Sequence, residues 1–265
     1  MDKFNEHTFA ICAYKKSKFL EECIKSIINQ EVESNIIIAT STNNDYITNL
    51  GEKYNIPVYI RDGKPDIQDD WNFAYENAKT KYVTIAHQDD IYNKNYSKHI
   101  KNESEKIEDS IIFFTDYREL KNGNVIPLTS NLKIKKILLA PLRIKSFRKS
   151  KFVRRRVLAL GSAICCPSVT LNKEVCGDKV FTSQYKCNLD WDTWAKLAVK
   201  DGSYIYINKE LMCHRIHEES ETSNSIANNV RQTEDYEMFL KFWPKVIVKI
   251  LMRYYVKSLK TNNVE

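Results

Sequence analysis

Two adjacent acids at the end of an apolar run are the first residues in this sequence that could do chemistry. Residues 82–86 are apolar and largely β-branched, and His87, Gln88, Asp89 and Asp90 follow them directly. Carboxylates suit hard divalent cations such as Mg²⁺ or Mn²⁺, which commonly join one or two acids to substrate phosphates. Two neighbouring acids can equally cap the loop and helix that follow. Their position at the end of a predicted buried strand favours the metal site.

The elements that would position these acids alternate through the first half of the chain. Strands are predicted at 8–14, 35–41, 56–62, 81–87 and 110–120, and helices at 17–30, 43–55, 69–80 and 93–109. This alternation predicts an α/β fold with a mainly parallel central sheet flanked by helices. Such sheets bind ligands outside the carboxyl ends of their strands. Tyr14, Ser41, Asp62 and residues 87–90 are therefore expected to share one crevice.

The second half changes in style. Strands are predicted at 163–173, 203–209 and 210–217, helices at 188–202, 223–243 and 244–260, and a hairpin turn at 121–124. We expect a nucleotide-sugar-binding half at 1–120, a helical, basic and amphipathic insert at 121–160, a catalytic and acceptor-binding half at 161–222 and C-terminal amphipathic helices at 223–265. The reasons for these functional labels are the resemblances described below.

Composition excludes several classes of protein. The chain has 265 residues, of which 43% are hydrophobic, and seven scattered cysteines without a Cys-x-x-Cys pair. A disulfide framework or a zinc site is therefore not expected, and a reducing cytoplasm is the simplest location. No signal peptide and no apolar run of about 20 residues is recognised.

The net charge of +7 is concentrated in one segment. Residues 131–156 contain eleven Lys or Arg and no acid. The segment is a solvated loop, a nucleic-acid patch or a membrane-surface element. Apolar residues that alternate with the basic ones favour an amphipathic segment on anionic lipid, although they could instead pack on the protein's own body. Because residues 244–260 have the same character, a peripheral position on the inner face of the plasma membrane is one expectation.

About the first 115 residues resemble the nucleotide-sugar half of family 2 glycosyltransferases with the GT-A fold. The resemblance rests on three segments: 9–30 (FAICAYKKSKFLEECIKSIINQ), 36–45 (IIIATSTNND) and 69–92 (DDWNFAYENAKTKYVTIAHQDDIY). It implies a Mn²⁺ or Mg²⁺ cofactor and a nucleotide-sugar donor. The implied donor-binding residues are Ala13, Tyr14, Thr40, Ser41, Asn72, His87, Gln88 and Asp89.

Two departures from the family pattern bear on these roles. Asp89 matches the acid that holds the metal against the diphosphate, but His87 stands where the first Asp of that motif usually lies. An imidazole is not an anion at pH 7, so the cation would be bound less tightly or by other ligands. Residues 40–44 offer hydroxyls and amides where the family commonly has acids that contact the base of the nucleotide. This departure bears on which base is bound, and a UDP-linked donor is the expectation.

Two later segments extend the resemblance. Residues 188–198 (NLDWDTWAKLA) resemble the family's Glu-Asp-x-x-x-Trp segment, with Asp190 at the Asp and Leu189 at the usual Glu. The resemblance implies that Asp190 is the general base, with Asp192 as a substitute; the alternative is that Asp190 caps its helix. Residues 213–220 (CHRIHEES) resemble the late Arg-x-His element, which makes His217 a candidate metal ligand or phosphate donor beside Arg215.

Aromatic side chains offer a further, weaker signal. Trp71 and Trp191 could line a sugar or acceptor cleft, because aromatic faces stack on sugar rings, or they could belong to the core. For Trp194 we expect the core.

These observations favour an inverting glycosyltransferase that moves a sugar from a nucleotide diphosphate to a glycan or lipid-linked acceptor with the help of a metal. An inactive nucleotide-sugar-binding or scaffold protein is the main alternative, with His87 as the sign of lost turnover. A nucleic-acid-binding protein is disfavoured because aromatics are few in 131–156. A nucleotidyltransferase is disfavoured because no glycine follows the first strand.

Overall fold

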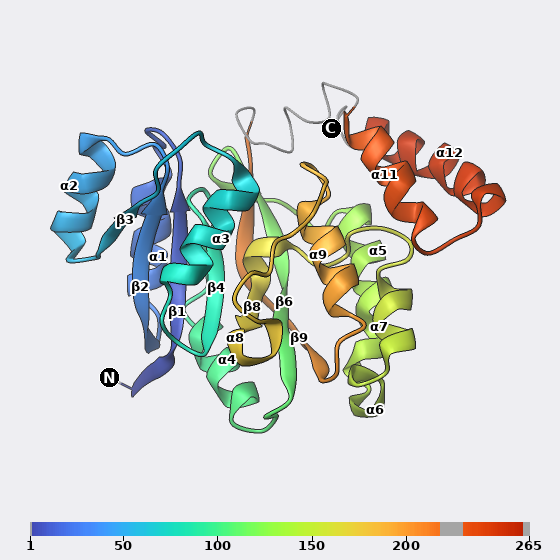
Figure 1. Ribbon diagram of the computed structural model, residues 1–265, viewed down its shortest axis with the longest axis horizontal. Coiled ribbons are helices and arrows are strands. Elements are labelled where there is room, and N and C mark those ends of the chain that lie inside the picture. Colours follow the sequence, from blue (N-terminus) through green and yellow to red (C-terminus); the bar gives the residue numbers. More distant parts are fainter. Residues whose placement is uncertain (1, 218–229, 262–265) are drawn as a thin grey trace.

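A computed structural model describes residues 2–217 and 230–261 of the chain (Figure 1). Over these residues one nine-stranded sheet runs in the order β3-β2-β1-β4-β8-β6-β9-β5, with β7 paired to β6. The strands are β1 (Asp2–Ala13), β2 (Val32–Thr40), β3 (Val58–Ile60), β4 (Tyr82–His87), β5 (Ile91–Tyr92), β6 (Ser110–Lys121), β7 (Asn124–Val125), β8 (Val169–Asn172) and β9 (Ser203–Ile216).

Parallel pairing dominates, and this confirms the predicted fold class. Strands β1, β2, β3 and β4 pair in parallel, and so do β6 and β9. The exceptions are β8, which lies antiparallel between β4 and β6, β5, which pairs antiparallel with β9, and β7, which pairs antiparallel with β6. Because β1, β2 and β4 run the same way, their carboxyl ends meet at one edge of the sheet.

Helices cover both faces of this sheet. They are α1 (Leu20–Ile28), α2 (Asp45–Tyr54), α3 (Ile67–Asn77), α4 (Tyr96–Ser104), α5 (Ser130–Leu139), α6 (Lys145–Arg148), α7 (Lys151–Val157), α8 (Lys173–Cys176), α9 (Leu189–Leu197), α11 (Val230–Leu240) and α12 (Lys245–Thr261). Helices α3, α8 and α9 lie in front of the sheet in Figure 1, and α11 and α12 lie together at the end opposite α2.

The strands divide their side chains between two hydrophobic cores. Phe9 and Ile11 of β1 belong to the core under α1, α2 and α4, whereas Ala10 between them belongs to the core under α3 and α9. Successive residues of a strand point to opposite faces, so a strand covered on both sides must be apolar throughout. That explains the continuous apolar runs in the sequence.

The basic insert is helical, as expected, and consists of α5, η1 (Ala140–Arg143), α6 and α7. Arg154 anchors it to the body: its guanidinium is buried and donates to the carbonyls of Gly202 and Lys200, both at 2.8 Å. The predicted turn at 121–124 is confirmed, because Asn122 and Gly123 have φ of 52° and 79° between β6 and β7.

Several predicted elements need correction. Residues 203–217 were expected to form two strands, but they form the single strand β9, which pairs with β6 over nearly its full length. The strand predicted at 163–173 is limited to β8, because Pro167 lies in a 3₁₀ turn, η2 (Cys166–Ser168), just before it. The helix expected at 223–243 is described from Val230 onward, and residues 223–229 lie outside the described residues.

The three tryptophans that could have lined a cleft are buried. Trp194 lies in the core, as expected, and Trp191 is equally buried and donates from its indole nitrogen to the carbonyl of Leu158 at 2.9 Å. Trp71 is also buried, with its ring stacked on His87 at 5.0 Å between centroids. Trp191 is therefore a core residue, and an aromatic cleft role for it is wrong.

Candidate active site

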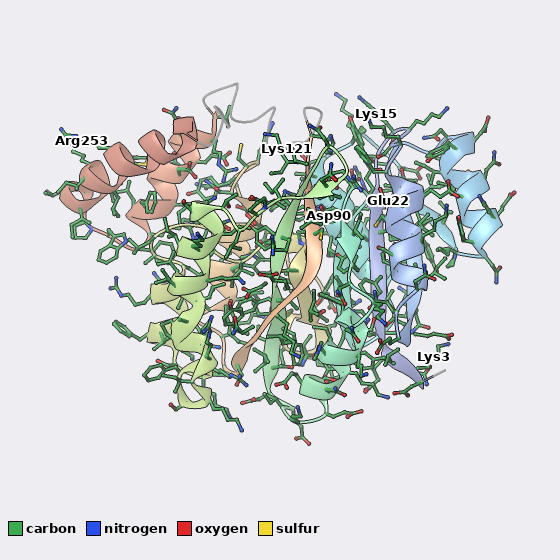
Figure 2. All side chains as sticks on the ribbon, turned by 180° about the vertical axis from the view of Figure 1, so that it is seen from behind. Lys3, Lys15, Glu22, Asp90, Lys121 and Arg253 are labelled. Atoms are coloured by element: carbon green, nitrogen blue, oxygen red, sulfur yellow. The ribbon has the colours of Figure 1, made fainter. Side chains whose placement is uncertain are left out.

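The carboxyl ends of β1, β2 and β4 form the floor of the candidate site. Cys12 of β1 is in register with His87 of β4, and Ala13 is in register with Thr40 of β2. The ends of β1 and β4 are locked together, since the Tyr14 amide donates to Gln88 Oε1 at 2.9 Å and Gln88 Nε2 donates back to the Tyr14 carbonyl at 3.1 Å. Asp90, Glu22 and Lys15 lie toward this end of the molecule in Figure 2.

Three potential metal ligands cluster immediately after β4. His87, Asp89 and Asp90 each offer a ligand atom, and these atoms lie within 4.8 Å of one another. Asp90 is fully buried, and its Oδ1 is bonded to His214 Nδ1 at 3.0 Å and accepts from the Arg215 amide at 2.9 Å. Its Oδ2 lies 4.0 Å from His87 Nδ1.

Two atoms in this cluster lack a hydrogen bond. Among the described residues, Asp90 Oδ2 and His87 Nε2 are buried and have no hydrogen-bond partner. Burying a polar atom unpaired costs about 1–3 kcal/mol, more for a charged group. A divalent cation is the kind of ligand that such carboxylate and imidazole atoms would accept, so the residues present fit a metal ion.

The end of β9 clamps the turn that carries the two acids. His217 Nε2 lies 2.8 Å from Asp89 Oδ2, and Arg215 Nε donates to the Asp89 carbonyl at 2.8 Å. The Arg215 guanidinium also pairs with Glu22 of α1 and lies 4.2 Å from the centre of the Phe19 ring. Strand β9 therefore joins α1 to the turn after β4.

These contacts set the charge states of the site. Burial alone would raise the pKa of Asp89, but the hydrogen bond with His217 and the charges of His87 and His214 outweigh it, so the pKa falls below its ordinary value. Burial lowers the pKa of His87. Burial would also lower the pKa of His214, but the Asp90 charge and hydrogen bond raise it to about 9. At neutral pH the site therefore holds an ionised Asp89, a neutral His87 and a charged His214.

Asp190 lies in the first turn of α9, close enough to His87 for the two charges to interact. Its Oδ1 accepts from the Trp191 amide at 2.7 Å, and Ser162 Oγ lies 3.5 Å from its Oδ2. The residue that precedes the helix at the cap position is Asn188, so the alternative in which Asp190 is the N-cap is wrong. Burial raises the pKa of Asp190, against the lowering charges of Arg231, Lys135 and His87.

Asp192, the substitute candidate for a base, has other partners. It is buried, and its carboxylate forms ion pairs with Lys196 at 2.8 Å and Lys241 at 2.5 Å. Two ammonium groups hold its charge in place and lower its pKa despite the opposing effect of burial. A carboxylate paired in this way is a poorer proton acceptor than Asp190.

The remaining donor-binding candidates divide into two groups. Ala13, Tyr14, Thr40, Ser41 and Gln88 lie at the carboxyl edge of the sheet, within or directly after β1, β2 and β4. Ser41 donates to Asp70 of α3 at 2.9 Å. Asn72 lies apart: both atoms of its amide bond to the backbone of Phe181, with Nδ2 donating at 2.7 Å and Oδ1 accepting at 3.1 Å.

Sequence reasoning overlooked some residues of the site. Asp90 was considered with Asp89 as a strand-end acid, but no ligand role was assigned to it separately. His214, inside the segment 213–220, was assigned no role. Glu22 and Lys135 carried no local signal, because Glu22 pairs with the distant Arg215 and Lys135 acts on Asp190 through its charge.

Comparisons with known proteins agree with this geometry. The family model described as glycosyl transferase family 2 matches residues 8–177, which is more than half of the chain. No curated protein sequence is significantly similar to the chain.

Solved structures of low sequence identity share the fold. TarS residues 1–349 of S. aureus, solved with UDP-GlcNAc, superpose with a TM-score of 0.61 at 13% identity, over 95% of this chain and 71% of that fragment. The mannosyltransferase PcManGT of Pyrobaculum calidifontis, solved with GDP-Man and Mn²⁺, gives 0.63 at 11% identity over 94% and 70%. Glucosyl-3-phosphoglycerate synthase of Mycobacterium tuberculosis, solved with Mn²⁺ and UDP-Glc, gives 0.51 at 14% over 87% and 77%.

Two findings lead to the same assignment: the family model matches the chain, and acids lie at the strand ends of its sheet. The chain belongs to glycosyl transferase family 2 and is a glycosyltransferase with the GT-A fold.

Proposed function

We propose that this protein transfers a sugar, with inversion, from a nucleotide diphosphate to a glycan or lipid-linked acceptor, with UDP as the preferred nucleotide. The observation that carries the proposal is the cluster of Asp89, Asp90, His87 and His217 where the carboxyl ends of the strands meet. The solved neighbours support a nucleotide-sugar donor, since their printed ligands are UDP-GlcNAc, GDP-Man and UDP-Glc.

A Mn²⁺ or Mg²⁺ ion would be held by Asp89 and His217, with Asp90 Oδ2 and His87 as further ligand atoms nearby. Such an ion neutralises the charge that develops on the departing diphosphate. Asp89 is suited to this role because it stays ionised at neutral pH. Because His217 is hydrogen-bonded to Asp89 at 2.8 Å, the pair would have to exchange this contact, wholly or in part, for contacts with the ion.

Asp190 is the proposed general base, which removes the proton of the acceptor hydroxyl as its oxygen attacks the anomeric carbon. Burial raises the pKa of Asp190, and a base whose pKa is closer to the working pH binds a proton more strongly in the transition state. Its Oδ1 is already engaged with its own helix, which leaves Oδ2, beside Ser162, to accept that proton.

A donor screen tests the proposal directly. Free nucleotide released from UDP-, GDP- and other nucleotide sugars is measured with Mn²⁺, with Mg²⁺ and with a chelator. We expect metal-dependent release that falls at least about 100-fold in Asp89→Asn and in Asp190→Asn, because each removes a charge that acts in the transition state. The exposed Asp178→Asn is the matched control and should keep wild-type activity.

The same screen distinguishes the alternative of an inactive binding protein. His87, in place of the family's usual acid, favours that alternative because a neutral ring contributes no charge to a cation. UDP binding in calorimetry without metal dependence or turnover would support it, and full activity in either Asp variant would remove the role assigned to that residue.

Contact with a membrane surface is a further part of the proposal. Ile137 of α5 and Val246 of α12 are 71% and 73% exposed, and the exposed Lys133 and Lys245 lie one turn before Ile137 and next to Val246. Basic helices with exposed apolar side chains bind anionic lipid, and each basic group near the surface adds about 1 kcal/mol. None of the described helices is both long and apolar enough to cross a bilayer.

Co-sedimentation with vesicles tests this contact. We expect binding to phosphatidylglycerol vesicles and much weaker binding to phosphatidylcholine vesicles, with loss of binding in the double variant Ile137→Ser and Val246→Ser. Val125→Ser, an exposed apolar residue outside these helices, is the control. Equal binding to both kinds of vesicle would contradict the proposal, and salt-sensitive binding to nucleic acid through residues 131–156 would replace it.

A further inference from the structure

Helix α11 bonds to the segment that leads into α9, and we propose that Glu234 of this helix is a positioning residue for Asp190. The inference rests on the proposed role of Asp190 as general base. It adds that a second helix, α11, fixes the position of this base. Residues 186–188 connect Glu234 to Asp190. Their backbone is bonded to Glu234, and they end two residues before Asp190.

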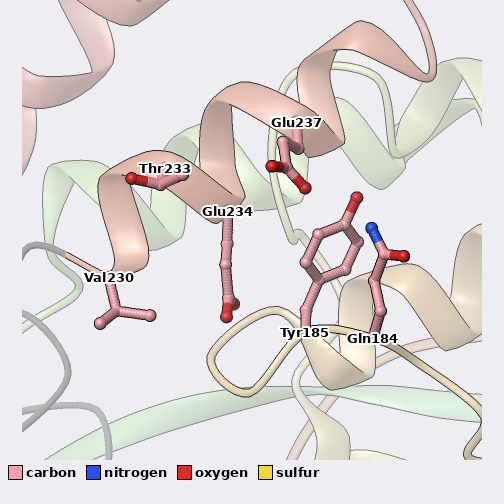
Figure 3. A pocket seen from close by; sticks show the side chains of 6 residues that line it. All are labelled: Gln184, Tyr185, Val230, Thr233, Glu234 and Glu237. Atoms are coloured by element: carbon pink, nitrogen blue, oxygen red, sulfur yellow. The ribbon is translucent and has the colours of Figure 1, made fainter.

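The Glu234 carboxylate accepts three backbone hydrogen bonds. Its Oε1 accepts from the Lys186 amide at 2.9 Å, and its Oε2 accepts from the amides of Cys187 and Asn188 at 2.8 and 3.0 Å. Glu234 is only 8% exposed. In Figure 3 its side chain reaches from α11 toward the loop that carries Tyr185, along one wall of an open cavity of about 410 Å³.

These bonds fix the residues that lead into α9, whose cap position makes no side-chain bond to the first turn. The residue at the cap position, Asn188, makes no side-chain bond to the first turn of the helix; its Nδ2 donates instead to Asp235 Oδ1 on α11 at 2.8 Å. The Asn188 amide, at the start of the helix, gains an acceptor in this way, and a carboxylate near a helix N-terminus is also favoured by the helix dipole. Here the acceptor comes from another helix, so the start of α9 is placed relative to α11.

The placement matters because Asp190 lies only two residues after the last bonded amide. Hydrogen bonds to a carboxylate are stronger than neutral ones, and three of them on consecutive amides leave this backbone little freedom. The base must lie within hydrogen-bonding reach of the acceptor hydroxyl, and a displacement of about 1 Å can cost about 100-fold in rate. A small rotation at residues 186–188 would produce such a displacement.

Helix α11 is itself fixed to the neighbouring elements, so it can serve as a reference. Lys241, just beyond α11, pairs with Asp192 on α9 at 2.5 Å, and its carbonyl accepts from Arg155 of α7 at 2.9 Å. The Trp243 indole nitrogen donates to the Ala159 carbonyl at 2.6 Å. The chain that follows Glu234 is therefore attached to α9, which carries Asp190, and to the segment around α7.

The test compares two acids of one helix. Glu234→Gln replaces one acceptor oxygen by an amide group that faces backbone donors, whereas Glu237→Gln makes the same change at an exposed acid that lines the same cavity. We expect kcat to fall about 10- to 100-fold in Glu234→Gln, with donor affinity in calorimetry within about twofold of wild type. Glu237→Gln should match the wild type in both. Assays are run well below the unfolding temperature of each variant.

Other results would overturn the inference. Wild-type kcat in Glu234→Gln would show that the contact does not position the base. A parallel loss of kcat, donor affinity and thermal stability would show that Glu234 only holds the fold together.

Combination with Asp190→Asn separates this inference from the proposed function. If Glu234 acts through Asp190, adding Glu234→Gln to Asp190→Asn lowers the residual rate no further, because the base it positions is already gone. If the double variant instead shows the product of the two separate rate losses, the inference is contradicted, while Asp190 remains the base. Full activity in Asp190→Asn alone would instead remove the base assignment itself, and the positioning role with it.

Discussion

Acid should destabilise this protein through one buried histidine, His7, well before its carboxylates titrate. His7 is 0% exposed, with Nδ1 2.8 Å from Ser34 Oγ and Nε2 2.9 Å from Thr84 Oγ1. Burial lowers its pKa from 6.5 to about 3. The folded state thus resists protonation, while the unfolded state accepts a proton near pH 6.5.

The sign and size of the effect follow from linkage. Because the pKa is lower in the folded state, the stability that neutral His7 allows is present above pH 6.5 and is lost as the pH falls from 6.5 toward 3. At about 1.4 kcal/mol per pH unit in this window, His7 alone removes about 2 kcal/mol between pH 7 and pH 5. Acids with ordinary pKa values near 4 contribute little over that range.

Urea unfolding at pH 7, 6 and 5 measures this change. The comparison is with His7→Gln, which cannot titrate and should lose about 2 kcal/mol less than the wild type between pH 7 and pH 5. His99→Gln, at a half-buried histidine of α4, is the control and should keep most of the wild-type slope. If wild type and His7→Gln lost stability equally, the burial argument would be refuted. His7 lies six residues before Ala13, about 20 Å along β1 from the strand end, so activity at pH 7 should be unchanged.

Three further substitutions test other parts of the structure. Asn72→Ala should cost about 2–4 kcal/mol in urea unfolding, because it leaves the buried amide and carbonyl of Phe181 without partners; a loss of UDP affinity at unchanged stability would instead favour a nucleotide-binding role for Asn72. Arg215→Met should lower metal-dependent nucleotide release at least about 10-fold, since it frees the turn at Asp89, and wild-type rates would contradict the clamp described above. Gly202→Ala should cost about 2–4 kcal/mol in thermal unfolding, because φ is +123° and a Cβ would lie 2.5 Å from a neighbouring backbone carbonyl oxygen; a neutral effect would show that the chain relaxes there at no cost.

The sequence determined the local elements and the edge at which the site forms. Apolar runs and helical spacing identify β1, α1, β2, α2, β3, α3 and β4, because each pattern lies within a few consecutive residues. The parallel arrangement follows from their alternation, and it brings the strand ends at Ala13, Thr40 and His87 together. Asp89 could therefore be assigned to the site from the sequence alone.

The order of the second half of the sheet needed the tertiary structure. No local pattern predicts that β8 inserts antiparallel between β4 and β6, or that 203–216 continue as one strand past the register shifts beside β6. Such pairings depend on which edges remain available once other strands have packed.

The same long-range packing decides the chemistry of the site. His217 reaches Asp89, and His214 reaches Asp90, across more than a hundred residues of sequence, because β9 and β5 pair beside the turn after β4. Glu234 reaches the amides of 186–188 only because α11 packs near the start of α9. Residue types can nominate an acid or a histidine, but burial and partners set its charge, and these exist only in the folded chain.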